Sequence, residues 1–556
     1  MPPFKPLLMT VMSLKLLATS SALATESLNT EGDSHPLQPN ILLVVADDLA
    51  YSDLGSFGGE IATPNIDHLA KHGIRLTNVY AAAACSPSRS MLMTGVDHHL
   101  AGLGNMAERI RPTQEGRPGY EGYLNSNVAS VAERLGAVGY RTYIAGKWHL
   151  GKERDQSPFA RGFDRSYVLL EGGGNHYNRG GMFPYAPIST YREDGKVVEL
   201  EKEFYSSKTY TDKLITYLDE QGDTRSPFFA YLAYTAPHWP LQAPRSVIEK
   251  YHGVYDKGYD DLREKRARAL QDQGLIDQAA TQRLDSLPDY RPWRALSPVE
   301  KAIQSRTMEV YAAMVEEMDR HLGRVLSRLK ETGDFDNTLI IFVSDNGAEG
   351  KFWDKHTGGT GQWIAETFDN RLENIGSESS YVYLGPGWAS ATMAPFYQVK
   401  RSASEGGIRV PAIIHCPRSL DCARGDIPAV LTVKDIAATL MAAGGVETGG
   451  TTFEGRSVQP VTGREFLTLL TGERELIYSE NEALVWELFG HRAVRKGDWK
   501  LVSLRPPFGD GVWRLYDLEN DPFERRDVSQ IALSRVSELI QEWEAFEVAN
   551  GVVLPE

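Results

Sequence analysis

Residues 40–48 have the sequence Asn-Ile-Leu-Leu-Val-Val-Ala-Asp-Asp, an uninterrupted apolar run that ends in two carboxylates. Such a run predicts a strand that is buried on both faces, as in a parallel sheet covered by helices. Similar runs occur at residues 141–145 (RTYIA), 228–234 (FFAYLAY) and 338–343 (TLIIFV). Helical patterns alternate with them, at residues 128–135 and in an apolar stripe from Tyr311 to Leu329. The sequence therefore predicts an α/β fold with a large, mostly parallel sheet sandwiched by helices.

The C-terminal part of the chain follows a different pattern, which begins after a Gly- and Thr-rich joint at residues 444–455. Strand-like pieces lie around Ile477, at residues 499–502 and at residues 513–516. An amphipathic helix is predicted from Leu533 to about Val548. We expect a large domain over residues 37–447 and a small α+β subdomain, an antiparallel sheet plus a helix, over residues 448–556.

Two insertions interrupt the large domain. Residues 247–300 are rich in Arg, Lys, Asp and Ala, which predicts a solvated helical excursion. Residues 350–398 mix Gly, Trp, Tyr, Ser and Thr without a period, which predicts a long loop region near a site.

Composition limits the classes of partner. Hydrophobic residues make up 42% of the chain and charged residues 24%, which is ordinary for a globular protein with a large core. The formal net charge of −15 argues against nucleic acid or an anionic membrane as the main partner. An anionic substrate would therefore need a local cationic pocket.

The first residues resemble an export signal. Lys5 precedes an apolar run, and Ala22-Leu23-Ala24 supplies a small-x-small cleavage pattern, so residues 1–24 predict a signal peptide; the alternative is a disordered tail. No later apolar stretch is long enough to span a bilayer. We expect an exported protein, free in a periplasm or outside the cell.

Each of the four buried runs is followed by polar side chains. They are Asp47 and Asp48, Lys147 and His149, His238, and Asp345 with Asn346. Taken singly, an acidic pair can cap a turn, a lone histidine can be structural and a lysine can be a surface charge. Because ligands bind beyond the carboxyl ends of such strands, the coincidence of four predicts a catalytic rim. Its three carboxylates and one amide form an all-oxygen set that favours Ca²⁺ or Mg²⁺ over zinc or copper.

The chain has three cysteines. Cys416 and Cys422 are close enough for a small loop disulfide in an oxidising compartment. Cys85 remains unpaired and stands just before a predicted helix start at Pro87, where the helix dipole favours negative charge. The alternative is a small buried apolar cysteine.

The segment Cys85-Ser86-Pro87-Ser88-Arg89 matches Cys-x-Pro-x-Arg, the signature of type I sulfatases, in which the cysteine is oxidised to formylglycine. Other motifs occur in that family's order, namely Asp47-Asp48, residues 146–151 (GKWHLG), 236–240 (APHWP), 344–347 (SDNG), 405–411 (EGGIRVP), 497–501 (GDWKL) and 515–518 (LYDL). Over nearly all of its length after the signal, the chain resembles these formylglycine-dependent sulfatases of the alkaline phosphatase superfamily. Residues 97–123 and 239–244 look particularly like bacterial arylsulfatases.

The resemblance implies an alkaline-phosphatase-like fold, with the domain at residues 37–447 as the catalytic domain. It also implies Ca²⁺ rather than Mg²⁺, and formylglycine at position 85 made by a separate maturation enzyme. The metal ligands that it implies are Asp47, Asp48, Cys85 in its modified form, Asp345 and Asn346. No particular oligomeric state follows from the motifs.

Roles for further residues follow from the same resemblance. Arg89 and Lys147 match the cations that hold the hydrated formylglycine and the sulfate oxygens, and His149 matches the histidine beside its second hydroxyl. Asp345 would take the proton of the attacking hydroxyl.

His238 and Lys400 match the leaving-group side of the family's site. Lys400 stands five residues before Glu405, which is the family's spacing, and the neighbouring Arg401 is the alternative for this role.

The implied reaction is hydrolysis of sulfate monoesters, with aryl sulfates, steroid sulfates and sulfated sugars as candidate substrates. One alternative is a phosphonate monoester or phosphodiester hydrolase, because relatives of this fold use the same modified cysteine. A non-catalytic binding protein is disfavoured, since every expected polar position is filled.

Overall fold

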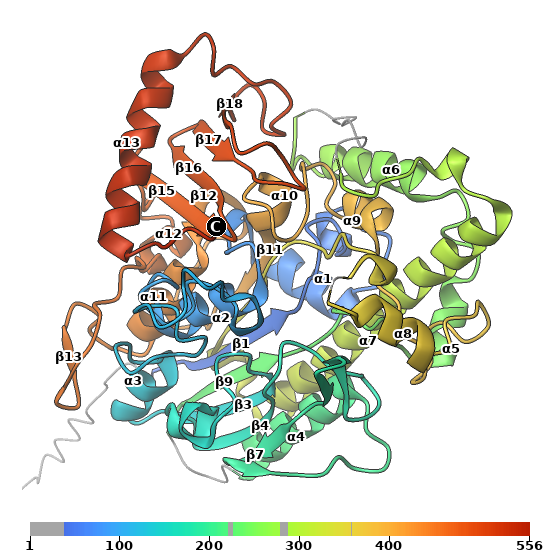
Figure 1. The fold of residues 1–556 in the computed structure, drawn as a ribbon. Helices are drawn as coiled ribbons and strands as arrows, with labels where there is room; N and C mark the ends of the chain where they lie inside the picture. Colours follow the sequence, from blue (N-terminus) through green and yellow to red (C-terminus); the bar gives the residue numbers. More distant parts are fainter. Residues whose placement is uncertain (1–37, 221–225, 278–286, 357) are drawn as a thin grey trace, which may run out of the picture. The chain divides into compact units, whose positions relative to one another are not determined.

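The computed structural model describes residues 38–220, 226–277, 287–356 and 358–556, so the predicted signal at residues 1–24 lies outside the described residues. A ten-stranded sheet organises the described chain (Figure 1). Its strands, in spatial order, are β12 (Gly425–Thr432), β2 (Ile74–Tyr80), β11 (Arg409–His415), β10 (Thr338–Ser344), β1 (Asn40–Ala46), β9 (Phe228–Ala233), β3 (Arg141–Lys147), β4 (Arg165–Leu169), β7 (Tyr191–Glu193) and β8 (Lys196–Val197).

The middle of this sheet is parallel. Strand β1 pairs in parallel with β10 on one side and with β9 on the other, and β3 continues the parallel order to β4. Antiparallel pairing occurs where β11 joins β10 to β2 and where β7 joins β4. All seven residues of β1 are buried, as its apolar run predicts. The predicted fold class, a large and mostly parallel sheet, is confirmed.

Alternate side chains of β1 enter two separate cores, one on each face of the sheet. Leu42 and Val44 pack with helices α1 (Pro64–His72), α4 (Ser206–Glu220) and α7 (Pro298–Thr332). Ile41 and Leu43 pack with α2 (Cys85–Thr94), α3 (Val131–Ala137) and α11 (Val433–Ala443). Since both faces are covered, the ends of the parallel strands are the part of the sheet at which a ligand can bind.

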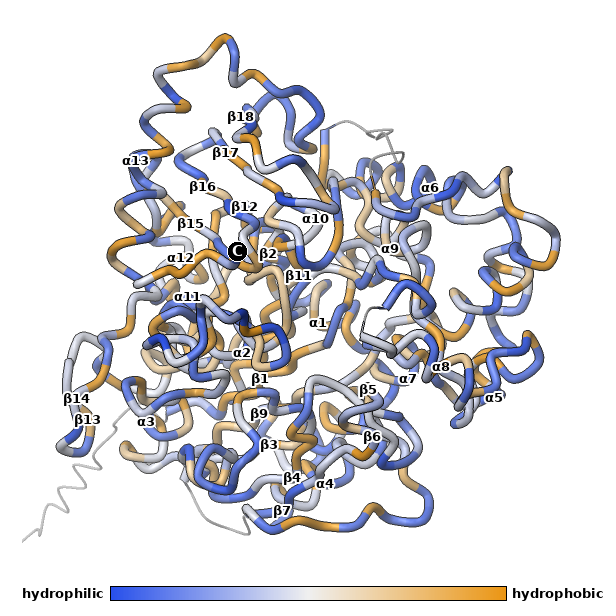
Figure 2. The backbone as a smooth tube through the Cα atoms, in the orientation of Figure 1, coloured by the Kyte–Doolittle hydropathy of each residue, from blue (hydrophilic) through white to orange (hydrophobic). Residues whose placement is uncertain are grey.

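The C-terminal region forms a four-stranded antiparallel sheet of β15 (Ala483–Leu488), β16 (His491–Lys496), β17 (Trp499–Ser503) and β18 (Trp513–Asp517). Helix α13 (Leu533–Asn550) packs on it through Leu539 and Trp543, and Figure 2 shows its alternating hydrophobic and hydrophilic residues. This confirms the small sheet with a helix.

One predicted strand of that sheet is wrong. The segment around Ile477 is not a strand, because the Ile477 side chain packs against the core of the large sheet. The hairpin of β15 and β16 occupies that place in the small sheet.

Both insertions are more ordered and more buried than their composition predicts. In the first, helix α6 (Tyr259–Asp272) buries Arg266, whose guanidinium pairs with Asp53 at 2.6 Å and with Glu60 at 2.9 Å. The excursion is therefore not wholly solvated, because distant carboxylates balance its charges. The second insertion contains helices α8 (Thr360–Thr367) and α9 (Pro386–Thr392) and is not one long loop.

Cys416 and Cys422 form a disulfide, whereas Cys85 is free and buried. Within the described ranges, no helix is both long enough and apolar enough to cross a membrane.

Candidate active site

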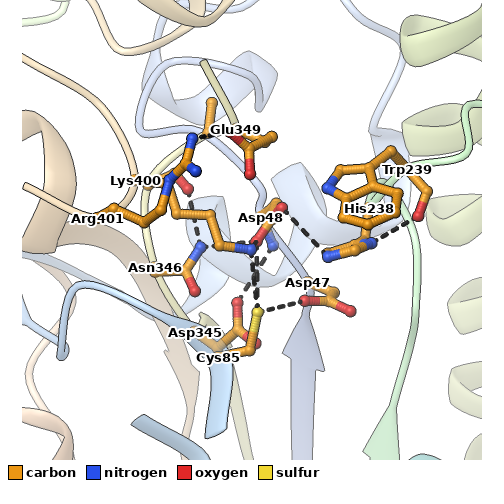
Figure 3. Close-up of polar contacts among 12 residues, drawn as sticks. Asp47, Asp48, Cys85, His238, Trp239, Asp345, Asn346, Glu349, Lys400 and Arg401 are labelled. Atoms are coloured by element: carbon orange, nitrogen blue, oxygen red, sulfur yellow. Dashed lines mark hydrogen bonds and ion pairs between the residues drawn. The ribbon is translucent and has the colours of Figure 1, made fainter. Parts of the chain in front are cut away.

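The acidic residues predicted at two strand ends lie together beyond β1 and β10 (Figure 3). The backbone N–H of Asp48 donates to Asp345 Oδ1 at 3.2 Å, and Asn346 Nδ2 donates to Asp48 Oδ1 at 2.7 Å. Asp48 has a φ of 63°, a left-handed conformation that costs free energy for a residue with a side chain. Strain of this kind is concentrated at functional sites, because the surrounding structure must hold it in place.

Cys85 is the first residue of α2 and lies against this acidic group. Its Sγ is 3.3 Å from Asp47 Oδ1, and the Nζ of Lys400 is 3.1 Å from Sγ. Burial and the neighbouring Asp345 raise the pKa of the Cys85 thiol well above its ordinary value. Because thiolate is the reactive form, unmodified Cys85 would be a poor nucleophile here.

Three buried cations face the carboxylates. Lys147 Nζ is 2.7 Å from Asp47 Oδ2, and Lys400 Nζ is 2.5 Å from Asp48 Oδ1. The Nε of Arg89, a residue on α2, donates to Asp345 at 2.9 Å. These pairings join side chains from five separate parts of the chain, which the fold brings to one rim.

These pairings do not compensate the charges of the carboxylates equally. Burial alone would raise the pKa of Asp48, but Lys400, with His238 and Lys147, holds it below its ordinary value. Burial and the charge of Asp47 raise the pKa of Asp345. The charge of Asp48 is therefore well compensated by protein cations, whereas that of Asp345 is not.

Two oxygen atoms at the centre of the group have no hydrogen-bond partner among the described residues. They are Asp48 Oδ2 and Asn346 Oδ1, and both side chains are buried. A buried unsatisfied acceptor is costly, so such atoms indicate a ligand that the protein chain does not supply. Asp47, Asp48 and Cys85, with His238, also offer ligand atoms within 4.8 Å of one another. The oxygen-rich donor set fits a dication such as Ca²⁺ or Mg²⁺.

His238 contacts this acidic group directly, and His149 lies near enough to Lys147 and Arg89 for their charges to act on its pKa, which burial lowers most. His238 Nδ1 donates to the carbonyl of Trp239 at 2.6 Å, and its Nε2 is 3.7 Å from Asp48 Oδ2. Burial lowers the pKa of His238 to about 3, although Asp48 acts in the opposite direction. His149 has a φ of 57° and is buried. The structure thus places every predicted site residue at this rim.

Comparisons with known proteins identify the family of the chain. A family model described as Sulfatase matches residues 39–446, and one described as N-sulphoglucosamine sulphohydrolase, C-terminal, matches residues 396–544. The chain belongs to the sulfatase family. It is a type I sulfatase of the alkaline phosphatase superfamily and hydrolyses sulfate esters.

Two relatives and one solved structure illustrate how closely the sulfatase matches known members. It is 42% identical over 528 residues to an uncharacterized sulfatase of Schizosaccharomyces pombe, across 93% of this chain and 94% of that one. It is 35% identical over 435 residues to an arylsulfatase of Klebsiella aerogenes, across 76% of this chain and 91% of that one. The crystal structure of Ps i-CgsB is 25% identical and superposes with a TM-score of 0.66, across 93% and 95% of the two chains.

The structure of the sulfatase site distinguishes Lys400 from Arg401, which is the alternative for the leaving-group role. Lys400 points into the acidic group, whereas Arg401 pairs with Glu349 at 2.6 Å (Figure 3). Arg401 has a φ of 75°, and this conformation is part of the turn that carries the two side chains in different directions. Lys400 is therefore the cation that lies next to position 85.

Glu108 is a site residue that sequence reasoning missed. Its Oε1 is 2.9 Å from His149 Nε2, and the contact holds the pKa of Glu108 at about 2 against the effect of burial. With Nε2 donating to this carboxylate, His149 Nδ1 is left buried without a partner among the described residues. Glu108 follows no strand and lies in none of the short motifs, so its only signal in the sequence is its place within residues 97–123, the stretch that resembles bacterial arylsulfatases.

Proposed function

We propose that this sulfatase hydrolyses aryl sulfates, with formylglycine made from Cys85 as its nucleophile and Ca²⁺ as its metal. The observation that carries the proposal is the pair of unsatisfied oxygens, Asp48 Oδ2 and Asn346 Oδ1, beside a buried residue 85. They support a dication at the point where the side chain of residue 85 ends.

The metal would be held by Asp47, Asp48, Asp345 and Asn346, together with the modified side chain of residue 85. When bound, Ca²⁺ would supply positive charge that polarises the sulfate group and favours ionisation of the nucleophile. The all-oxygen donor set favours it over zinc, which prefers nitrogen and sulfur ligands.

A modified residue 85 is supported by the state of the thiol. A buried thiol with a raised pKa is a weak nucleophile, and a separate maturation enzyme with an external oxidant would replace it by an aldehyde. In hydrated form, that aldehyde would supply two hydroxyl groups on one carbon, one to attack sulfur and one to release sulfate.

The chain's own cations would bind the sulfate group. Lys147, Lys400 and Arg89 converge on position 85, and together with the proposed Ca²⁺ they would outweigh the three carboxylates and form the local positive region that a protein of net charge −15 needs for an anionic substrate. Fixed charges of this kind stabilise the transition state without reorganisation. His149, held by Glu108, would accept a proton at Nδ1 when the second hydroxyl releases sulfate.

The aryl preference is supported by aromatic side chains on the leaving-group side. The ring of Trp239 lies 4.7 Å from that of His238 and 4.2 Å from that of Tyr383, with which it is stacked. His238 lies between this aromatic region and the acidic group, whereas Lys400 approaches Asp48 from the opposite side, and both would stabilise the departing oxygen. We also propose export to the periplasm or the cell exterior, on the pattern of residues 1–24 and the Cys416–Cys422 disulfide.

The test is a comparison of purified, matured protein on 4-nitrophenyl sulfate and on a 4-nitrophenyl phosphonate monoester, with metal analysis of the same sample. We expect faster turnover of the sulfate and one tightly bound calcium per chain. Faster turnover of the phosphonate would favour the alternative activity, and stoichiometric zinc without calcium or magnesium would contradict the proposed metal.

A further inference from the structure

The aromatic side chains beyond His238 contain two hydrogen-bond donors that nothing in the described structure uses. Trp239 and Tyr383 are 6% and 3% exposed, and their Nε1 and hydroxyl groups have no partner among the described residues. Burial of an N–H or O–H group without a partner costs stability, so natural proteins keep few of them. Two such donors on stacked rings beside a catalytic centre indicate a position for a polar ligand.

The orientation of Trp239 places this position on the path of the leaving group. In Figure 3 the indole lies beside His238, and its nitrogen-bearing edge faces the side on which Glu349 and Arg401 lie. A leaving group that departs from Cys85 on the His238 side would therefore contact the Trp239 ring.

Two unpaired cations stand at the rim of the same region. The side chains of Arg109 and Lys351 have no ion-pair or hydrogen-bond partner in the part of the chain that is described, and both are half-buried. Arg109 follows Glu108, which contacts His149, and the backbone N–H of Lys351 donates to Glu349 at 2.9 Å. Both cations are thus attached to segments that already contact the site.

The local electrostatic balance at this rim is positive. Arg401 neutralises Glu349, and Glu108 is engaged by His149, so of the carboxylates named here only Asp289 acts against the charges of Arg109 and Lys351. Burial and the charges of Arg401 and Arg109 lower the pKa of Lys351 to about 8, although Glu349 and Asp289 act in the opposite direction. The aromatic ring of Tyr383 lies in the same field, since Glu349, Arg401 and Arg109 all act on its hydroxyl.

Resting on the proposed aryl sulfatase function, we propose that the substrate is an aryl sulfate whose ring carries a second anionic substituent. The ring stacks on Trp239 and Tyr383, their free donors contact its polar substituent, and Arg109 and Lys351 attract the second negative charge. A cationic rim raises the affinity for such a substrate and its rate of association, and both effects weaken as ionic strength rises.

The experiment compares kcat/KM for 4-carboxyphenyl sulfate with that for the neutral 4-carbamoylphenyl sulfate. We expect the carboxylate to be preferred, and the ratio of the two values to fall about fivefold in Arg109→Gln and in Lys351→Met at low ionic strength. Leaving-group acidity cancels when the ratio of a variant is divided by that of the wild type. Lys71→Met, on the exposed surface of α1, is the matched control and should leave the ratio unchanged.

Tyr383→Phe separates a binding role from a structural one, because it deletes only the unpaired hydroxyl. We expect KM to rise about fivefold for both substrates while the melting temperature stays the same or increases. A ratio that is unchanged in Arg109→Gln and Lys351→Met overturns the inference alone. No turnover of either sulfate by the matured wild type overturns the proposed function, and the inference with it.

Discussion

Two buried clusters of charged side chains lie at the two ends of the Lys400–Glu405 segment, and they differ in how completely their oxygen atoms are satisfied. At the active site, Lys147, Lys400 and Arg89 face a carboxylate group in which Asp48 Oδ2 and Asn346 Oδ1 lack hydrogen-bond partners among the described residues, with His238 no nearer than 3.7 Å to Asp48 Oδ2. The second cluster, here called the junction cluster, consists of Glu405, Lys500 and Glu524 and joins the large domain to the small sheet.

In the junction cluster every carboxylate oxygen lies within 3.0 Å of a cation or an N–H or O–H donor, although Glu524 Oε1 is held by an ion pair without hydrogen-bond geometry. Lys500 Nζ is 2.6 Å from Glu405 Oε1 and 2.9 Å from Glu524 Oε1. The hydroxyl of Tyr80 donates to Glu405 Oε2 at 2.8 Å, and the backbone N–H of Glu405 donates to Glu524 Oε2 at 3.0 Å. A closed set of this kind stabilises one arrangement of the chain, whereas the open set at the site is complete only with a ligand. Substitutions should therefore affect stability in one cluster and activity in the other.

Metal removal should produce the largest effect and should concern the open cluster alone. Treatment with a chelator is expected to lower activity on the order of 10³-fold, because the charge that polarises the sulfate is lost, and added Ca²⁺ should restore it. Asn346→Ala should need a higher Ca²⁺ concentration for the same recovery. Full activity in protein shown by metal analysis to contain no calcium or magnesium would end the assignment of this cluster as a metal site.

Removal of His238 should separate the leaving-group side of the open cluster from the rest. An alkoxide needs a proton when it departs and a nitrophenolate does not, so His238→Ala should slow alkyl sulfates by about 10²–10⁴-fold and 4-nitrophenyl sulfate much less. Single-turnover rates are the appropriate measurement, with His149→Ala as a control that should depend less on the leaving group. Equal losses across leaving groups of different acidity would remove His238 from the role of acid.

Lys500→Met should show the opposite behaviour, with lost stability and retained chemistry. It leaves Glu405 and Glu524 buried without their cation, which typically costs about 3–5 kcal/mol of unfolding free energy. Denaturant unfolding gives this value, and kcat per folded molecule should stay within about twofold of the wild type. A large fall in kcat at unchanged stability would mean that the two clusters are not independent.

A second connection between the large domain and the small sheet should make the free energy of unfolding depend on pH. The expected change is about as large as that for Lys500→Met, or smaller. His99 on the large domain bridges Asp97 at 2.8 Å and Glu487 of β15 at 2.9 Å. Burial would lower the pKa of His99, but these two carboxylates outweigh it and raise the pKa from 6.5 to about 9. Because the folded-state pKa is the higher one, the contribution is complete below about pH 6.5 and is lost as pH rises through about 9.

The size of that contribution is on the order of 3 kcal/mol. Unfolding free energies of the wild type and of His99→Gln, measured across this pH range, provide the check. The variant should lose the alkaline decline in stability, and an identical decline in both proteins would contradict the role of His99.

One local pattern in the sequence, an apolar run that ends in polar side chains, predicted much of the fold and much of the site. The run at residues 40–46 is apolar throughout because both faces of β1 are covered, and Asp47 and Asp48 mark the end of the strand at which ligands bind. Such local patterns suffice to predict a strand and its functional end.

What the sequence did not predict depends on contacts between distant segments. Arg266 is buried only because Asp53 and Glu60, some 200 residues earlier, pair with it, and Glu108 joins the site only through His149. The hairpin of β15 and β16 did carry a local signal in the sequence, namely Gly490. Its turn has positive φ at Phe489 and at Gly490, a conformation that glycine favours. A glycine between two runs of β-forming residues could have indicated it.

The chemical state of residue 85 in active protein is the most direct test of the proposed mechanism. Mass spectrometry of the peptide that contains this residue should show the thiol replaced by an aldehyde or its hydrate, in proportion to the specific activity of each preparation. A fully active preparation that carries only unmodified Cys85 would contradict the account.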